Sequence, residues 1–426
     1  MIERGQALTL IDPHGDLARL VLAQLVARGH FHDERAFDRL LYLDLPAAER
    51  QNLFLPFNVL RQPLPPHSLA ANIKEAFHRA WPALSGGAAP MFDALVQDGV
   101  KVLISNDLPL TTLYRLLTDK TFRDGLLQKE TDPDVVRFFR EQFDRLAPRD
   151  QAQQAGAALR RAHLLTFSPA LRHSLGQSEN RLDFRRIIDG NQTVIINLAL
   201  GDAETRRLLG CLLTVGAEQG ALSRMQLPPG ERANTYHLIC DEWIEFAAQS
   251  EEALSRMLSL TRKVGLFAVL AHQTWTQTSL RMRGALQNVG LEVAFRLGRP
   301  DAEYAASILG RIDPAAVKHR VADPAAAARG HPLFEPLSEQ WERWVQAIQD
   351  LAPRQAFIRH SDGMVRKIRT LSTPDPSLSP RALEEVEAES LRRHFRPRMA
   401  GEQGVADQRG RPLRGRLPRW RDLNAG

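Results

Sequence analysis

The sequence has few of the residues and runs that build disulfide-bonded, membrane-spanning or secreted proteins. Its two cysteines, Cys211 and Cys240, lie in apolar stretches without Cys-x-x-Cys or histidine spacing. They are expected to be buried free thiols in a reducing compartment. The longest apolar runs fall far short of the ~20 residues that cross a bilayer. The stretch "MIERGQALTL" lacks a secretory signal pattern, so we expect a cytoplasmic chain.

No glycine in the sequence is followed by a lysine. A phosphate-binding loop of the form Gly-x-x-x-x-Gly-Lys-Ser/Thr requires that dipeptide, because the lysine reaches the β- and γ-phosphates. The stretch "SGGAAP", residues 85–90, has the glycines but no lysine, and it lies among expected helices. A phosphate-binding loop of this type is therefore excluded.

Acidic residues are outnumbered: 56 Lys and Arg against 50 Asp and Glu give a net charge of +6. The bias is strongest in residues 392–423, which are rich in arginine and poor in acids. Such a segment suits a polyanion such as DNA, although a solvated tail is an equal alternative. The candidate nucleic-acid contacts are Arg409, Arg411, Arg414, Arg416 and Arg419.

Short apolar runs alternate with helical patterns, which predicts an α/β fold with a parallel, doubly wound sheet. The expected strands are residues 7–12, 39–45, 192–200, 235–241, 266–273 and 291–298. After residue 190 they are separated by amphipathic segments such as "AETRRLLGCLLTVGAEQGAL". A closing hairpin is expected in "QAFIRHSDGMVRKIRTL", turning at Asp362 and Gly363.

The stretch from Ser68 to Ser174 shows no convincing strand, and its apolar residues recur at the spacing of amphipathic helices. We therefore expect an all-α subdomain inserted into the α/β domain. The expected boundaries are 1–66 for the first part of the α/β domain, 67–180 for the all-α subdomain, 181–374 for the second part, and 375–426 for a helix and basic tail.

Polar side chains follow the expected strands, at the edge where an open parallel sheet binds its ligands. In "TYHLICDEWIEF", Asp241 can hold Mg²⁺ and the adjacent Glu242 can polarise an attacking water. Gln273 ends "VLAHQ", and its amide can orient that water or sense a γ-phosphate. A solvated strand end is the alternative for the acidic pair, but the glutamine at a second strand end favours the functional interpretation.

Asp12, His14 and Asp16 alternate after the first expected strand. Alternating side chains of these types can hold a metal ion. An aspartate and a glycine at this point are also typical of a turn and a helix cap. The turn is the favoured interpretation.

Seven stretches in one order resemble the conjugative DNA-transfer ATPases. These are the TraD/TraG-like coupling proteins of type IV secretion, in the HerA/FtsK group of P-loop ATPases. The resemblance covers about residues 5–372, and its specificity comes from the collinear order, since each stretch alone is weak. The stretches are "GQALTLIDPHGDLARLVLAQL", "LLYLDLPAAERQNLFLPFNVL", "VIINLALGDAETRRLLGCLL", "YHLICDEWIEFA", "LTRKVGLFAVLAHQTWTQ", "ALQNVGLEVAFRLGRPDAE" and "QAFIRHSDG".

The resemblance implies a RecA-like domain with an inserted all-α domain, ATP and Mg²⁺ as cofactors, and ATP-driven DNA translocation by a hexameric ring. By position, Asp241 and Glu242 match the Walker B acids, with Asp241 as the Mg²⁺ and nucleotide ligand. Gln273 matches the sensor glutamine. Arg262 in "LTRKVG" matches the arginine that reaches a neighbouring subunit's site, a task that suits a guanidinium because it stays charged and grips phosphate oxygens. A surface helix position is the alternative for Arg262.

The sequence departs from this family at its start. In the family, a P-loop strand, its Gly-Lys-Ser/Thr loop and most of the next helix precede the region that matches "LTLIDPHGDL". Only "MIERG" stands before that strand here. We therefore expect the chain to be a fragment that lacks the P-loop strand, the product of a mis-called start codon, or one product of a split gene.

Two functions follow from these observations. The first is the motor domain of a DNA-translocating ATPase of conjugation or type IV secretion. Its partners would be DNA and other secretion or relaxosome proteins, and its location would be the cytoplasm or the inner membrane. The second is a non-catalytic DNA- or relaxosome-binding module derived from such an ATPase. The chain by itself is predicted not to hydrolyse ATP, because nothing in it holds the triphosphate in line with the water beside Glu242.

Overall fold

The computed structural model describes residues 1–81, 90–228, 234–246, 257–258, 261–275, 278–286, 289–321 and 331–398. The chain forms two compact units, described separately below. The first comprises Met1–Ala271 with Pro376–Gly426, and the second comprises His272–Asp375. In the described residues, no helix is both long and apolar enough to cross a membrane.

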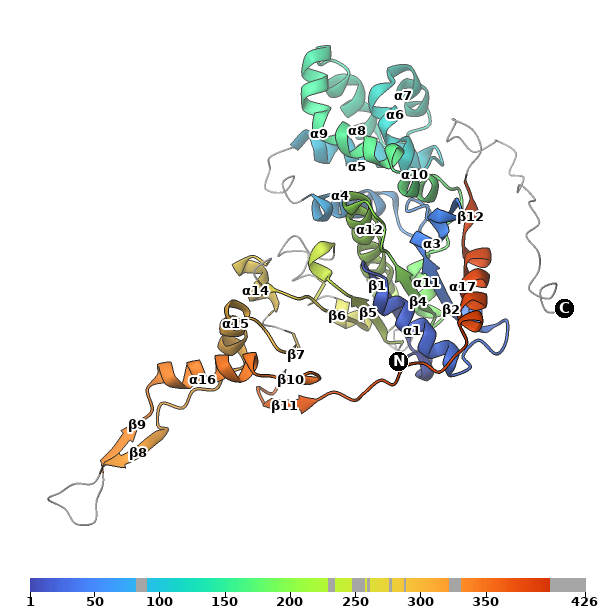
Figure 1. The fold of residues 1–426 in the computed structure, drawn as a ribbon. Coiled ribbons are helices and arrows are strands. Elements are labelled where there is room, and N and C mark those ends of the chain that lie inside the picture. Colours follow the sequence, from blue (N-terminus) through green and yellow to red (C-terminus); the bar gives the residue numbers. More distant parts are fainter. Residues whose placement is uncertain are drawn as a thin grey trace. The chain divides into compact units, whose positions relative to one another are not determined.

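The centre of the first unit is a five-stranded sheet in which all neighbouring strands are parallel (Figure 1). The strand order is β2-β4-β1-β5-β6. Each strand is a short apolar run, as the sequence predicts: β1 (Ala7–Asp12), β2 (Leu40–Asp44), β4 (Thr193–Asn197), β5 (Tyr236–Cys240) and β6 (Leu266–Leu270). Two short strands, β3 (Leu53–Phe54) and β12 (Arg396–Pro397), pair with each other beside this sheet.

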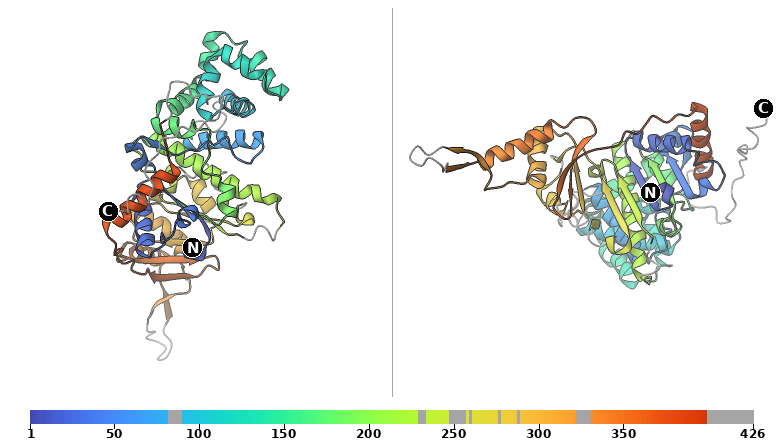
Figure 2. Two further views of the ribbon diagram at one scale, coloured as in Figure 1. Left: turned by 90° about the vertical axis from the view of Figure 1, so that its right-hand side faces the viewer. Right: turned by 90° about the horizontal axis from the view of Figure 1, so that it is seen from below.

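Helices cover both faces of the sheet. The connection from β1 through α1 (Asp16–Ala27) to β2 crosses the sheet in one direction. The connection from β4 through α12 (Ala203–Leu222) to β5 crosses it in the opposite direction. Because such crossovers are right-handed, α1 and α12 lie on opposite faces. The carboxy-terminal helix α17 (Pro380–His394) packs against α1 and β2. In Figure 2, this helix is red and lies beside the blue amino-terminal elements.

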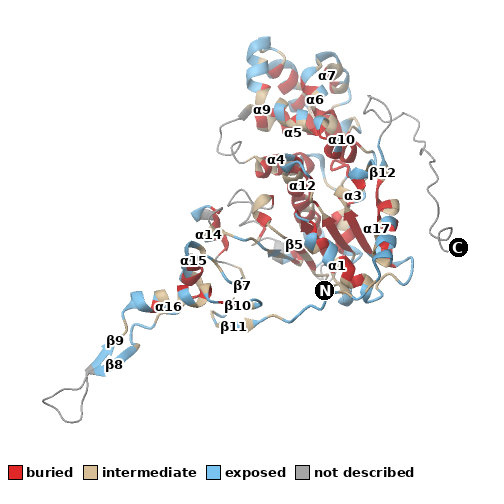
Figure 3. Ribbon diagram, in the orientation of Figure 1, coloured by how far each residue is buried: buried red, intermediate tan, exposed pale blue. Residues whose placement is uncertain are grey.

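The packed interior follows from alternation along the strands. Residues of one face of β1, β2 and β4 join side chains of α1 and α17 in one buried cluster (Figure 3). Its buried members are Leu8, Leu10, Ala18, Leu22, Leu25, Phe37, Leu40, Tyr42, Ile195 and Val386. The helix α1 ends as predicted: Gly29 has a φ of 71°, and its N–H donates to the Val26 carbonyl at 2.9 Å.

Within the described residues 68–81 and 90–174 there is no strand, as predicted. Outside this helical region, two short helices follow β2 and precede β4: α3 (Leu45–Arg50) and α11 (Phe184–Asp189). The helical region contains α4 (Pro66–Ala80), α5 (Pro90–Ser105), α6 (Leu113–Thr118), α7 (Lys120–Leu127), α8 (Pro133–Arg137), α9 (Pro148–Phe167) and α10 (Pro169–Leu175). The exact subdomain boundaries stay a prediction.

A buried ion pair joins this helical region to the sheet domain. The Arg79 guanidinium on α4 donates to both carboxylate oxygens of Glu218 on α12, at 2.7 and 2.8 Å. Both side chains are almost fully buried. Removing one partner would leave a buried charge uncompensated, so the pair fixes how α4 packs on α12.

The second unit corrects one prediction. Residues 291–298 were expected to join the same parallel sheet, but β7 (Leu291–Ala294) pairs antiparallel with β10 (Gln355–His360) in a separate sheet of order β11-β10-β7. An apolar run defines a strand and its faces, but it does not define the partner or its direction. The hairpin of β10 and β11 (Val365–Arg369) is confirmed, with Gly363 in its turn at a φ of 78°.

The remaining elements of the second unit are α14 (Leu280–Leu286), α15 (Arg299–Leu309), β8 (Val317–Val321), β9 (His331–Phe334) and α16 (Leu337–Gln349). The helices α15 and α16 pack together with Phe357 of β10 around one apolar cluster. The antiparallel ribbon of β8 and β9 was not predicted.

Candidate functional site

The carboxyl ends of the parallel strands meet along one rim of the sheet. Asp44 of β2 and Asp12 of β1 each lie in register with Asn197 of β4. On the other side of β1, the Asp241 N–H donates to the Ile11 carbonyl at 3.1 Å, which places Asp241 beside the end of β1. The adjacent strand β6 runs parallel to β5, with Leu270 opposite Cys240. Of the polar strand ends predicted from the sequence, Asp12 and Asp241 are therefore neighbours.

The strand ends of β2 and β4 are occupied with local hydrogen bonds. Asp44 caps helix α3 by accepting from the Ala47 N–H at 2.8 Å, and its other oxygen accepts from the Asn197 amide at 3.2 Å. The side-chain oxygen Oδ1 of Asn197 accepts in turn from the Ala199 N–H at 3.1 Å. These polar side chains position loops. Asn197 was not among the predicted rim residues, although its place at the end of "VIIN" is the signal that would have found it.

Asp12 has the turn and cap role that the sequence favoured. Its carboxylate is fully buried and accepts hydrogen bonds from the His14 N–H at 2.9 Å and the Ala18 N–H at 2.8 Å. Gly15 has a φ of 86°, and a Cβ there would lie 2.5 Å from the Asn197 side chain, so glycine is required. In the part of the chain that the structure describes, no group of three His, Cys, Asp or Glu side chains could hold a metal ion.

Asp241 differs from the other rim residues because it is held partly out of water without a cationic partner among the described residues. Burial raises the pKa of its carboxyl above the ordinary value, and the negative charge of Asp12 raises it further. The Glu242 N–H and His14 oppose this shift. A carboxylate in such surroundings gains from a bound cation, which removes the unfavourable charge.

Glu242 lies in a strained backbone conformation. Its φ is 44° and its ψ is 45°, the left-handed region that a side chain of this type rarely adopts. The following residue imposes this bend: Trp243 is fully buried, and its N–H donates to the Ala271 carbonyl at 3.0 Å. Glu242 is partly buried, and its carboxylate has no hydrogen-bond or ion-pair partner among the described residues. Strain of this kind is concentrated at functional sites.

A second anchor holds the segment after Glu242 against α12. Phe246 is fully buried, and a Cβ on Gly210 would lie only 2.7 Å from its ring. The Cys211 thiol donates to the Phe246 carbonyl at 3.0 Å. Burial raises the pKa of this thiol to about 12, so Cys211 is a packed structural residue and not a nucleophile. Sequence reasoning missed Gly210 and Phe246, since a lone glycine in a helix carries no functional signal.

The other predicted residues are described only in part. Gln273 belongs to the second unit, where its side chain is exposed, so its meeting with Asp241 stays a prediction. The backbone of Arg262 lies in a short 3₁₀ helix, Thr261–Val264, but its side chain lies outside the described residues. Its role in a neighbouring subunit also stays a prediction.

The predicted nucleic-acid contacts Arg409, Arg411, Arg414, Arg416 and Arg419 lie outside the described residues. The first arginines of the basic segment are already engaged in protein contacts. Arg392 and Arg393 both donate to the Glu389 carboxylate, and the Arg393 guanidinium lies over the Phe37 ring at 5.0 Å. The Arg393 contact joins α17 to Phe37, whereas the Arg392 contact stays within α17.

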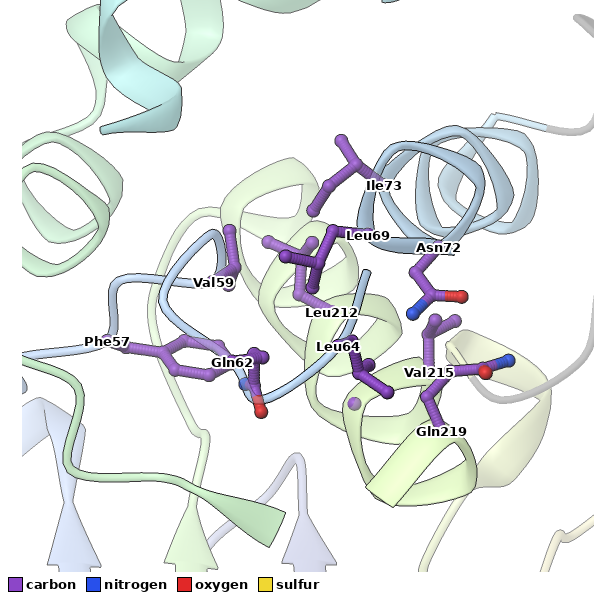
Figure 4. Close-up of a pocket in the computed structure, with 11 residues that line it drawn as sticks. Phe57, Val59, Gln62, Leu64, Leu69, Asn72, Ile73, Leu212, Val215 and Gln219 are labelled. Atoms are coloured by element: carbon purple, nitrogen blue, oxygen red, sulfur yellow. The ribbon is translucent and has the colours of Figure 1, made fainter. Parts of the chain in front are cut away.

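Two surface hollows lie away from the rim. The first, shown in Figure 4 between α4 and α12, has a volume of about 20 Å³, which holds little more than one water. The second, of about 210 Å³, is lined by residues of α17 and of the segment from α1 to α2 (Ala36–Arg39). Neither is lined by lysine or arginine.

Comparison with known proteins agrees with the class that the sheet and its rim define, a RecA-like α/β fold carrying an inserted all-α region. No family model matches the sequence, and no curated protein matches it significantly. Solved structures of the bacterial conjugative coupling protein TrwB are similar. The unbound monoclinic form has a TM-score of 0.58 and 15% identity, covering 89% of this chain and 81% of its own.

The complex of TrwB with ADP and Mg²⁺ gives a TM-score of 0.55 at 14% identity, and that with a non-hydrolysable ATP analogue gives 0.54 at 15%. Each covers 89% of this chain and 82% of the TrwB chain. At such identity the similarity shows the fold. This chain therefore has the fold of a conjugative coupling protein. In the described sheet, β6 is the edge strand next to β5.

Proposed function

We propose that this chain is the motor domain of a DNA-translocating ATPase of conjugation or type IV secretion. The observation that carries the proposal is the position of Asp241 and Glu242. They follow β5, which lies between β1 and β6 in the parallel sheet. The carboxyl pKa of Asp241 is raised, and Glu242 is held in a strained bend. The TrwB structures with ADP, Mg²⁺ and an ATP analogue support nucleotide as the ligand.

The residues fit one half of a magnesium–nucleotide site. Asp241 would hold Mg²⁺, whose charge would neutralise phosphate oxygens. Glu242 would accept a proton from the attacking water, since its carboxylate is free of other partners in the described structure. Gln273 would orient that water, and Arg262 would contribute to a neighbouring subunit's site in a hexamer. The other half does not fit: no lysine follows a glycine, so no phosphate loop of the Gly-Lys type is present.

A second function is favoured by that same missing loop. The chain could act as a non-catalytic module that binds DNA or relaxosome proteins through its helical region and its basic tail. Both functions predict DNA as a partner, and both are compatible with assembly at the inner membrane. They differ in whether the carboxylate rim still participates in chemistry.

Phosphate release by the purified chain, with and without single-stranded DNA, tests the choice. The 426-residue chain is expected to show no turnover. A variant extended before Met1 by a strand, a Gly-x-x-x-x-Gly-Lys-Ser loop and a helix is expected to gain DNA-stimulated turnover, which Glu242→Gln then abolishes. A folded extended chain without turnover would favour the binding module. Turnover by the unextended chain that Glu242→Gln abolishes would show that the chain contains a phosphate-binding element of another type.

The DNA part of the proposal needs a separate measurement. Residues 399–426 can be removed without cutting α17, which ends at His394. If the tail contacts phosphates, this deletion reduces the slope of the logarithm of affinity against the logarithm of salt concentration, by about 0.7 per lost contact on single strands. An unchanged slope would identify the tail as solvated.

A further inference from the structure

The larger of the two hollows lies between α17 and the segment that links α1 to α2. Its volume is about 210 Å³. Its apolar wall consists of Val26, Phe31 and Phe37 on one side and of Ala382 and Val386, in the first two turns of α17, on the other. The rings of Phe31 and Phe37 are tilted against each other, with 4.9 Å between their centroids. We name this site the α17 hollow. Its wall suits one large apolar or aromatic side chain.

The walls of the α17 hollow are fixed by packing. Phe37 and Val386 are buried members of the apolar cluster on β1, β2 and β4, and Val26 and Phe31 pack against that cluster. The Arg393 guanidinium lies over the Phe37 ring and holds it from the other end of α17. A site that is formed before its occupant arrives loses little free energy to ordering when the occupant docks.

The surface around the α17 hollow is acidic. Residues 30–39 and 380–388 together contain six acids and three arginines, a formal charge of −3 with histidine neutral. Among these acids, Glu34, Asp38 and Glu385 are exposed. An acidic rim around an apolar hollow favours an occupant that is apolar at its centre and cationic at its sides.

The exposed carboxylates of this rim are weakly engaged within the fold. Arg393 approaches Glu34 at 3.8 Å and Asp38 at 3.7 Å, which is too far for a hydrogen bond. Arg381 pairs with Glu385 at 2.9 Å, but both side chains are exposed. Exposed ion pairs of this kind contribute little to stability, so these carboxylates can accept further arginines.

The chain itself contains a segment with the matching composition. Residues 399–426, the tail, follow Arg398, the last described residue. Within the tail, residues 409–423 contain six arginines and one acid, a formal charge of +5. Trp420 stands there between Arg419 and Arg421. A large aromatic ring with a cation on each side is the occupant that the hollow and its rim favour.

The tail is long enough to reach the hollow. The α17 hollow adjoins the start of α17, whereas the tail begins just beyond its end. The helix has 15 residues and is therefore about 22 Å long. The 22 residues from Arg398 to Trp420 can span up to about 70 Å. A tethered segment acts at an effective concentration of the order of millimolar, which favours it over a free partner.

We propose that the α17 hollow is the docking site of the tail motif Arg419–Trp420–Arg421 of the same chain. The Trp420 ring enters the hollow beside Phe31, and tail arginines pair with exposed rim carboxylates such as Glu34 and Glu385. One consequence rests on the proposed function: the tail arginines are also the candidate DNA contacts, so a docked tail is withheld from DNA. DNA and the acidic rim then compete for the same cations.

Hydrogen exchange tests the docking in the full chain. The amides of residues 29–39 and of the first turns of α17 should exchange at least about 3-fold more slowly in the full chain than in a chain ending at Arg398. Trp420→Ala should remove this protection. Leu413→Ala, a tail substitution outside the motif, is the matched control and should keep it. Circular dichroism checks that each variant folds.

Three outcomes would overturn the docking. Equal exchange with and without the tail would show that the hollow stays empty. Protection that survives Trp420→Ala would show that this ring is not the occupant. Protection that grows with protein concentration, together with dimers on light scattering, would identify the occupant as a segment of a second copy.

Filling the hollow separates docking from DNA binding. Ala382→Phe places a ring of the chain's own in the hollow and leaves the tail unchanged. With a labelled single-stranded oligonucleotide, this variant should bind about 3-fold more tightly than the native chain, whereas removing residues 399–426 should weaken binding. Ala382→Phe in the chain without the tail is the control and should change nothing.

The two measurements fail in different ways. Protection of the hollow without a gain in DNA affinity on filling it would overturn the competition, while the docking would stand. Absence of DNA binding by every variant would overturn the DNA part of the proposed function and leave the docking intact. A gain in DNA affinity for Ala382→Phe that persists without the tail would overturn the competition, because the released arginines could not be its cause.

Discussion

The sheet has a closed half, β2, β4 and β1, and an open half, β5 and β6, which are built from the same kind of strand but have different surroundings. In the closed half, α1 and α17 bury one face, and the rim side chains Asp44, Asn197 and Asp12 are consumed in caps and turns. In the open half, Phe267 and Val269 are exposed, and Asp241 and Glu242 lack such local roles. The comparison shows that the polar side chains at the ends of β1, β2 and β4 are used in hydrogen bonds of the fold, whereas the Asp241 and Glu242 side chains make no such bonds among the described residues.

The largest effect is expected from a matched pair of substitutions in one row of residues in register across the sheet, Tyr42–Ile195–Leu10–Ile239–Val269. Ile195 is fully buried in the closed half, so Ile195→Ala should lower the free energy of unfolding by about 2–5 kcal/mol. Val269 ends the same row in the open half, and Val269→Ala should cost less than about 1 kcal/mol. Urea unfolding followed by circular dichroism measures both. Equal losses would mean that the open half is covered in solution.

Acid is expected to loosen the cover of the closed half. His394 at the end of α17 is buried, and burial, together with Arg181, Arg393 and Arg396, lowers its pKa to about 4. The unfolded chain therefore takes up this proton first as the pH falls. The stability that the fold has with His394 neutral is fully present above about pH 6.5. As the pH falls from about 6.5 to about 4, the free energy of unfolding decreases by roughly 1–3 kcal/mol.

Thermal unfolding across that pH range, compared between the native chain and His394→Gln, isolates this residue. The variant should have a lower melting temperature at pH 7.5 and a flatter pH profile. Parallel profiles for the two proteins would show that His394 is not buried as a neutral group.

Two carboxylates on the rim should respond in opposite ways to removal of their charge. Asp12 accepts from two backbone N–H groups, and asparagine offers only one acceptor oxygen, so Asp12→Asn should cost about 1–3 kcal/mol. Asp241 has a raised pKa, so the fold disfavours its ionised form at neutral pH. Asp241→Asn should therefore raise the melting temperature by a few degrees in the absence of divalent cations. A loss of stability in both variants would contradict the contrast between the halves.

The smallest effect on stability is expected in the edge strand β6, where a substitution should instead change self-association. Phe267→Thr keeps a residue that favours strands and removes an exposed aromatic ring, so the free energy of unfolding should change by less than about 0.5 kcal/mol. Self-association of the chain should decrease, as measured by light scattering over a concentration series. Thr9 lies fully buried in the closed half, and Thr9→Phe is the control that should unfold the chain.

The local pattern of the sequence predicted the strands of the parallel sheet, the helices between them and the candidate rim. Each of these depends on residues close together in the chain: the apolar run that becomes β5, the glycine that ends α1, and the acids that follow "HLIC". Partner choice depends on residues far apart, and here the sequence was insufficient. The strand β7 was expected in the parallel sheet and instead pairs antiparallel with β10. An alternating run has two edges that can pair, and it does not specify which strand pairs with it or whether the pairing is parallel or antiparallel.

By itself, the sequence determined that the chain has strands with polar ends and no Gly-Lys loop, since both facts depend only on residue order. Only the tertiary structure decided which of the polar side chains at the strand ends make hydrogen bonds within the fold and which do not. Asp12 and Asp241 look alike in sequence, each at the end of an apolar run. In the fold, two amides satisfy Asp12, while Asp241 is partly buried beside another negative charge. The same is true of Ile195 and Val269, because coverage by α1 depends on how far each strand lies from that helix across the sheet.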